Sequence, residues 1–107
     1  MTDGYLLHFY MREDQRHHHH LLWEWLLEQA NKLGIGGGSA FRAIGGFGHH
    51  HVLHDQRFFE LAGTLAVKVE FIVNESESKQ LLELVEREKI TLFYVCLPAR
   101  FGNLGTQ

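Results

Sequence analysis

The sequence is poor in the residues that cross-link, interrupt or anchor a chain. Cys96 is the only cysteine among 107 residues, so no intrachain disulfide can form, and proline also occurs only once. No apolar run approaches the roughly 20 residues that span a bilayer, and the chain opens without the basic and apolar regions of a secretory signal. We therefore expect a cytoplasmic protein without disulfides and without membrane insertion.

The sequence also has little excess charge of either sign. Ten Lys and Arg residues stand against thirteen Asp and Glu residues, which gives a formal net charge of −3. Such a balance offers no basic face, so we predict no nucleic-acid partner. The nine histidines would add positive charge below about pH 6.5, and any anion binding should then depend on pH. With 45% hydrophobic residues, the chain fits a single domain over residues 1–107.

The apolar positions predict an alternation of strands and helices. Val67, Val69 and Phe71 alternate with the outward positions Lys68 and Glu70, which is the period of a half-buried strand. A capping box, in which the first and fourth residues bond each other's backbone, predicts where the second helix begins. The expected order is strand 4–11, helix 18–33, strand 39–47, strand 64–73, a helix opened by Asn74 and Glu77, and strand 91–98 ended by Pro98.

This β-α-β-β-α-β order predicts an α+β, ferredoxin-like fold: an antiparallel four-stranded sheet with two helices on one face and a long loop after the second strand. The first two strands of this fold point the same way. The end of the first strand, the start of the first helix, the loop after the second strand and the turn containing Lys89 therefore share one edge of the sheet. The topology brings the histidines of 17–20 to the same edge as those of 49–54.

The glycines of the loop allow two interpretations. Gly45, Gly46 and Gly48 can adopt positive φ and let a ligand approach backbone N–H groups, as in an anion-binding nest. The alternative is a strand that ends in a hinge without a ligand. The connection after the second strand is long enough to be of the kind that is usually functional or disordered.

The histidines allow a metal interpretation. Neutral imidazole binds zinc, nickel or copper, and two histidines at i and i+4 on a helical turn share one side. Histidines 17–20, placed in a first helical turn, could complete such a site, although an exposed polar tract without a ligand remains the alternative. The candidate metal ligands are His49, His50, His51, His54, His17 and His20.

Other residues support no catalytic constellation, and we do not expect an enzyme. We interpret Cys96 as a small buried residue and His8 as a histidine satisfied within the core. Trp23 and Trp25 lie nearly opposite each other on the first helix, so one would face the core and the other could meet a neighbouring subunit or remain partly buried. The glutamates of the second helix indicate a solvated face: Glu75, Glu77, Glu83, Glu86 and Glu88.

The segments "GYLLHFYMRE", "FRAIGGFG", "FFELAGTLAVKVEFIV" and "TLFYV" resemble small, uncharacterised PII-like proteins related to PII signalling proteins and to CutA. The resemblance covers residues 4–97 and is most specific at "IGGFG". It implies a homotrimer of ferredoxin-like subunits whose loop after the second strand senses an effector, with adenine nucleotides bound between subunits. The candidate ligand-binding residues are Arg42, Gly45, Gly46, Phe47, Gly48, Lys89 and Arg100, of which the last two are loose counterparts of phosphate-gripping residues.

The sequence thus leaves two hypotheses open. The first is a PII-like regulatory protein in which a small effector, most naturally an adenine nucleotide, binds at the loop and changes the signal passed to a protein target. The alternative is a CutA-like protein that holds zinc, nickel or copper with its loop histidines.

Overall fold

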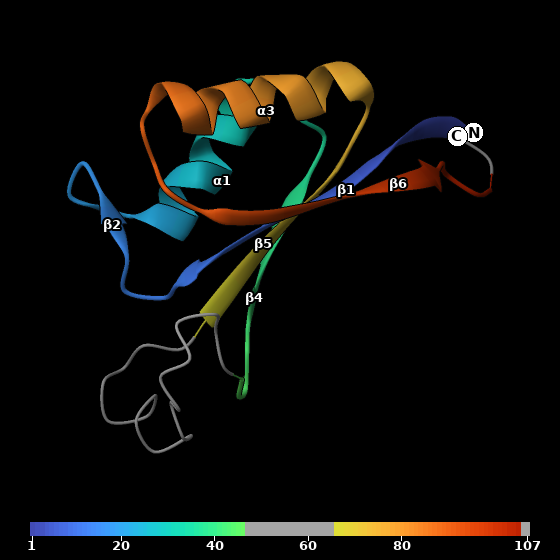
Figure 1. The fold of residues 1–107 in the computed structure, drawn as a ribbon. Coiled ribbons are helices and arrows are strands. Elements are labelled where there is room, and N and C mark those ends of the chain that lie inside the picture. The colour runs from blue at the N-terminus through green and yellow to red at the C-terminus, as the bar shows by residue number, and fades with distance from the viewer. Residues whose placement is uncertain (47–65, 106–107) are drawn as a thin grey trace.

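The computed structural model describes residues 1–46 and 66–105. Its main sheet has four strands in the order β4-β5-β1-β6, and each neighbouring pair is antiparallel. Helices α1 (Leu22–Lys32) and α3 (Glu75–Arg87) cover the same face (Figure 1). The strands are β1 (Thr2–Arg12), β4 (Gly38–Arg42), β5 (Ala66–Val73) and β6 (Phe93–Phe101). The predicted ferredoxin-like α+β architecture is confirmed.

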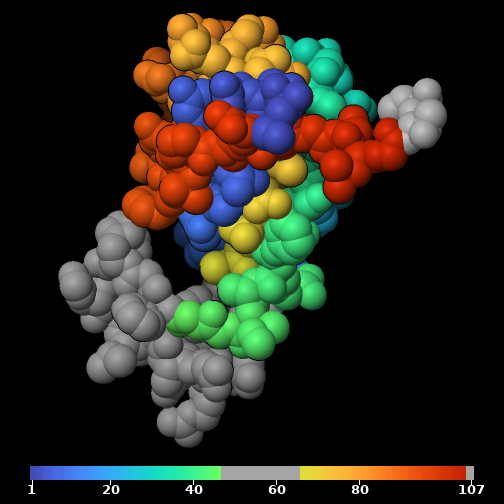
Figure 2. Space-filling view, turned by 90° about the vertical axis from the view of Figure 1, so that its right-hand side faces the viewer, coloured from blue at the N-terminus to red at the C-terminus, as the bar shows by residue number. Residues whose placement is uncertain are grey.

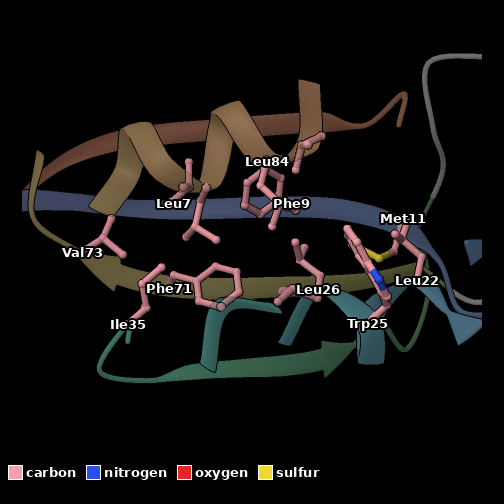
Figure 3. Packing of buried hydrophobic residues seen from close by; sticks show 14 of the residues in the cluster. Leu7, Phe9, Met11, Leu22, Trp25, Leu26, Ile35, Phe71, Val73 and Leu84 are labelled. Carbon is pink, nitrogen blue, oxygen red and sulfur yellow. The ribbon is translucent and has the colours of Figure 1, made fainter. Parts of the chain in front are cut away.

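The core lies between the two central strands and the helices. Leu7 is paired with Phe71 and Phe9 with Val69, so residues of one parity on both strands point toward the helices. Figure 3 shows the side chains of the two strands, Phe9 and Phe71 among them, beside Leu26 of α1 and Leu84 of α3. Burial of this apolar surface, at about 25 cal/mol per Å², is the main stabilising contribution to the fold.

Helix α3 begins at the predicted capping box. The side chain of Asn74 accepts a hydrogen bond from the backbone N–H of Glu77 at 2.8 Å, and the Glu77 carboxylate accepts from the N–H of Asn74 at 2.9 Å. Two N–H groups that the helix itself cannot satisfy are thereby paired. On α1, Trp25 is buried in the core and Trp23 is only partly buried against it. This agrees with the expectation that only one of the two indoles faces the core.

Strand β6 departs from the sequence prediction in two respects. It continues through Pro98 to Phe101, because β6 is an edge strand and proline can occupy an edge without breaking a ladder on both sides. Cys96 is exposed rather than buried, since the helices pack over β1 and β5 and leave β6 uncovered. Figure 2 shows atoms of β6 and β1 on the surface of the molecule.

The face of the sheet opposite the helices is largely apolar. Ile72 is 49% exposed and Phe93 is 62% exposed, and Leu97 is exposed as well. Near the middle of this face His8 Nε2 lies 2.8 Å from a carboxylate oxygen of Glu70, so His8 has a partner on the outer face rather than in the core. Within the described ranges, no helix is long and apolar enough to cross a membrane.

The first helix starts later than predicted, because residues 16–21 form a hairpin instead of a helical turn. Strands β2 (Arg16–His17) and β3 (His20–Leu21) pair antiparallel, and α1 begins only at Leu22. The prediction that residues 17–20 lie in the first helical turn is therefore wrong. The sequence signal for such a hairpin is normally Asn-Gly or Asp-Gly, and a turn made of two histidines carries no such signal.

Candidate functional site

The two ends of the sheet differ in what they assemble. At one end, which we call the histidine end, β1 finishes at Arg12, β4 finishes at Arg42 and the β2–β3 hairpin follows. At the other end, which we call the terminal end, Thr2 of β1 pairs with Phe101 of β6. Figure 1 shows the hairpin beside the turn that follows α3, far from the N-terminus.

The turn of the hairpin is built from histidines in the left-handed region of the backbone. His18 has φ 49° and His19 has φ 69°, and the flanking His17 and His20 pair with each other. Two consecutive residues with positive φ are typical of the type I′ turn, which matches the twist of a two-stranded ribbon. The guanidinium of Arg16 donates to the carbonyl of His19 at 3.1 Å and supports this conformation.

This turn brings two imidazoles to one carboxylate. His17 Nε2 lies 2.9 Å and His18 Nε2 lies 3.2 Å from the same oxygen, Oε1 of Glu88. One candidate ligand atom from each of the three side chains lies within 4.8 Å of the other two. Glu88 is separated from His17 by 71 residues in sequence, so the fold alone creates this cluster. We call it the His17–His18–Glu88 cluster.

Packing fixes the inner part of the cluster. The ring of His17 meets the indole of Trp25 edge to face at 4.5 Å, and its side chain is 15% exposed. Glu88 ends α3 with its backbone N–H bonded to the carbonyl of Leu84 at 3.0 Å. The side chain of Glu88 is 28% exposed and that of His18 is 70% exposed, so solvent reaches the cluster from the side of His18.

The histidines change the acidity of Glu88. The hydrogen bond from His17 lowers the pKa of the Glu88 carboxyl below its ordinary value of 4.5, and the bond from His18 adds to this effect against an opposing desolvation. A hydrogen bond to the charged form of a carboxyl favours that form. The cluster therefore holds a carboxylate in its ionised, ligand-competent state.

A second contact of the histidine end involves the predicted ligand residue Arg42. The guanidinium of Arg42 is ion-paired with the carboxylate of Glu13, just beyond the end of β1. After Arg42, the backbone N–H of Ala43 donates a hydrogen bond to the carbonyl of Ala66. Gly45 and Gly46 follow two residues later. Gly46 has φ +154°, and a Cβ atom there would meet no atom of residues 1–46 or 66–105 within 4 Å.

The other predicted basic residues occupy opposite ends of the molecule. Lys89, with φ 58°, directly follows Glu88 and so lies at the histidine end, as the topology predicted. Arg100 pairs with Asp3 at 3.0 Å at the terminal end, where it lines a shallow depression with Tyr5. Within one chain, Arg42 and Arg100 cannot contact the same small ligand, because nearly the full length of β1 separates their partners.

Several predicted residues are not placed. Phe47, Gly48, His49, His50, His51 and His54 lie outside the described residues. His20 pairs with His17 in the hairpin and does not join the His17–His18–Glu88 cluster. The sequence analysis missed Glu88 and Glu13 as partners. The predicted topology put the turn containing Lys89 at the same edge of the sheet as histidines 17–20. This was the one sequence signal that pointed toward Glu88.

Two solved structures have the same arrangement of strands and helices. One, from Thermus thermophilus, is described as PII-like and signaling; it is 18% identical, with a TM-score of 0.59 over 92% of this chain and 91% of that one. The other is CPII of Thiomonas intermedia K12, bound to ADP, AMP and acetate; it is 17% identical, with a TM-score of 0.55 over 96% and 94% of the two chains. The fold is therefore that of the PII-like signalling proteins.

Sequence comparison places the chain within a family. Residues 4–94 match the family DUF190, described as "Uncharacterized ACR, COG1993", and the chain belongs to this family. A UPF0166 protein of Aquifex aeolicus (strain VF5) is 33% identical over 81 residues, which cover 76% of this chain and 77% of that protein. The resemblance to a PII-like uncharacterised family is thus confirmed, and these comparisons give no support to the CutA-like alternative.

Proposed function

We propose that this protein is a PII-like regulatory protein that binds an adenine nucleotide at the histidine end and signals its presence to a protein target. One observation carries the proposal: the chain shares its fold, over nearly its whole length, with a protein bound to ADP and AMP. The placement of Arg42 immediately before the glycines of the strand end supports the same location. The role is binding rather than catalysis.

Arg42 is the described side chain best suited to meet a phosphate. Its guanidinium is 60% exposed and offers the planar donors that recognise phosphate oxygens. In the free protein this guanidinium forms an ion pair with the carboxylate of Glu13. A nucleotide phosphate would compete with the Glu13 carboxylate, and binding would exchange a contact to the β1 end for a contact to the ligand. Such an exchange is a local electrostatic switch of the kind that moves loops.

Self-association is part of the proposal. No strand of the described residues pairs with the outer edge of β6, and its exposed aromatic residues, Phe93 and Tyr94, lie on opposite faces of the sheet. Exposed apolar edges of this kind are usually covered by another chain. We propose a homotrimer in which neighbouring subunits cover β6 and the uncovered sheet face, which would also allow a neighbour's Arg100 to reach a ligand. Light scattering should then give three times the mass of one chain.

The direct test is nucleotide binding to tag-free, metal-stripped protein. A ligand at about 100 times its dissociation constant should raise the free energy of unfolding by about 2.7 kcal/mol, which a thermal melt detects. We expect ADP or AMP to raise the melting temperature and GDP at the same concentration to have a smaller effect. Absence of any shift with ADP, AMP or ATP at millimolar concentration would contradict the proposal.

Two neutral substitutions separate the roles of Arg42 and Glu13. Arg42→Gln should weaken nucleotide binding about tenfold or more, since a charge-assisted contact contributes about 1.5–3 kcal/mol. Glu13→Gln should instead strengthen binding, because the competing carboxylate is gone. Lys79→Gln, on the exposed face of α3, removes one positive charge and serves as the control. If Arg42→Gln and Lys79→Gln have equal effects, Arg42 does not hold the phosphate.

A further inference from the structure

We propose that the His17–His18–Glu88 cluster is a binding site for a divalent transition-metal ion, with zinc as the natural occupant. The site is separate from the proposed nucleotide contact at Arg42 and includes none of the loop histidines. Among the described residues it differs from the predicted ligand set, because His18 and Glu88 join His17 whereas His20 does not.

The distances between the candidate ligand atoms fit a tetrahedral ion. Zinc binds imidazole nitrogen and carboxylate oxygen at about 2.0–2.2 Å, so ligands at tetrahedral angles lie ~3.3–3.5 Å apart. The two nitrogen-to-oxygen distances to Glu88 Oε1 are 2.9 Å and 3.2 Å. These two distances are within a few tenths of an ångström of the tetrahedral value, and the two imidazole nitrogens lie no more than 4.8 Å apart. Two imidazoles and one carboxylate are also the donors that zinc prefers when a fourth position stays open to water.

The charge of the surroundings favours a cation at this place. Glu88 stands at the C-terminal end of α3, where the carbonyl groups of the last turn give the helix a partial negative charge. A carboxylate at this end is unfavourable by itself and is favoured when a cation lies beside it. In the free protein the hydrogen bonds from His17 and His18 fill that role. A metal would replace both bonds, and the proton on each Nε2 would move to Nδ1 or leave to solvent.

Packing fixes two members of the cluster, and the third is exposed to solvent. His17 is fixed between Trp25 and Glu88, and Glu88 is fixed by the end of the helix. His18, the most exposed member, supplies the entry path. An ion here would join the hairpin to the end of α3 across 70 residues of sequence, so its binding should stabilise the fold.

The test is a zinc titration of the full chain, tag-free and stripped of metal, in which His49, His50, His51 and His54 are all changed to asparagine. This removes the other imidazoles of the histidine-rich segment. We expect one zinc per chain by calorimetry and a melting temperature that rises with zinc. Cobalt(II), used as a spectroscopic probe, should give the intense visible absorption of a tetrahedral site.

Matched substitutions assign the ligands. Glu88→Gln and Glu86→Gln remove the same charge from neighbouring parts of α3, and only Glu88→Gln should weaken zinc binding, by at least about tenfold, since even an outer partner of a ligand contributes that much. His18→Gln and His19→Gln alter adjacent residues of the same turn, and only His18→Gln should weaken it. Equal effects within both pairs, or no stoichiometric binding at all, would overturn the proposal. Melting without metal confirms that each variant is folded.

Discussion

The histidine end and the terminal end of the sheet are built by different means. At the terminal end, strand pairing runs to Phe101, and the capping box of α3 satisfies its backbone locally. At the histidine end, side-chain contacts join the hairpin to the end of α3, and the described non-glycine residues with positive φ, His18, His19 and Lys89, all lie there. Backbone conformations of this kind cost about 1–3 kcal/mol each and cluster at binding sites and switches.

This difference indicates that the two ends of the sheet have different roles. The terminal end packs closely around Gly4, which lies against Val73 and Phe101, whereas the histidine end keeps polar contacts and strained backbone that local stability alone would not select. The proposed nucleotide contact and the proposed metal site both lie at the histidine end, although they involve different residues. The following predictions test the contrast between the two ends.

Glycine substitution should have its largest effect at the terminal end. A Cβ at Gly4 would collide with the backbone carbonyl of Val73 and with the ring of Phe101, so Gly4→Ala should destabilise the fold by about 3 kcal/mol. Gly46→Ala meets no described atom within 4 Å and strains a φ that favours glycine, at a cost of about 1 kcal/mol. Urea unfolding of both variants measures this. Equal costs would show that the terminal end is not the more closely packed.

In the turn at His18 and His19, introducing a glycine should stabilise the protein, whereas replacing Gly4 should destabilise it. His19→Gly places a residue without a Cβ at φ 69° and should stabilise the protein by about 0.5–1 kcal/mol, if relief of strain exceeds the entropy gained by the unfolded chain. Chemical unfolding gives the difference in free energy, and Ser76→Gly on the exposed first turn of α3 is the control expected to destabilise. If His19→Gly destabilises the protein as much as Ser76→Gly does, the turn is not strained.

Acid should weaken the hydrogen bonds of Glu88. Because its pKa is lowered in the folded protein, their stabilising effect is present above the unfolded pKa near 4.5 and is lost as the pH falls through the folded pKa. In metal-free protein, the stability difference between wild type and Glu88→Gln should therefore shrink as the pH falls below about 4.5. A difference that stays unchanged as the pH falls well below 4.5 would contradict the assigned hydrogen bonds.

The success of the sequence analysis followed the range of the interactions. The alternation of residues 66–73 and the capping box at Asn74 are local patterns, and both predicted their elements correctly. The pairing of β6 beyond Pro98 depends on the strand's place at an edge, which local pattern does not encode. The role of Glu88 depends on a contact across the whole fold, so its position on a charged helix suggested only a solvated face.

The most direct test of the central claim is hydrogen exchange, followed by mass spectrometry, on the full chain with and without saturating ADP. If the nucleotide binds at the histidine end, peptides that contain Arg42 to Gly46 should exchange more slowly in its presence. Peptides confined to the terminal end around Thr2 should change less, apart from any contact made by a neighbour's Arg100. Protection limited to the terminal end, or no protection under conditions where ADP is bound, would contradict the account.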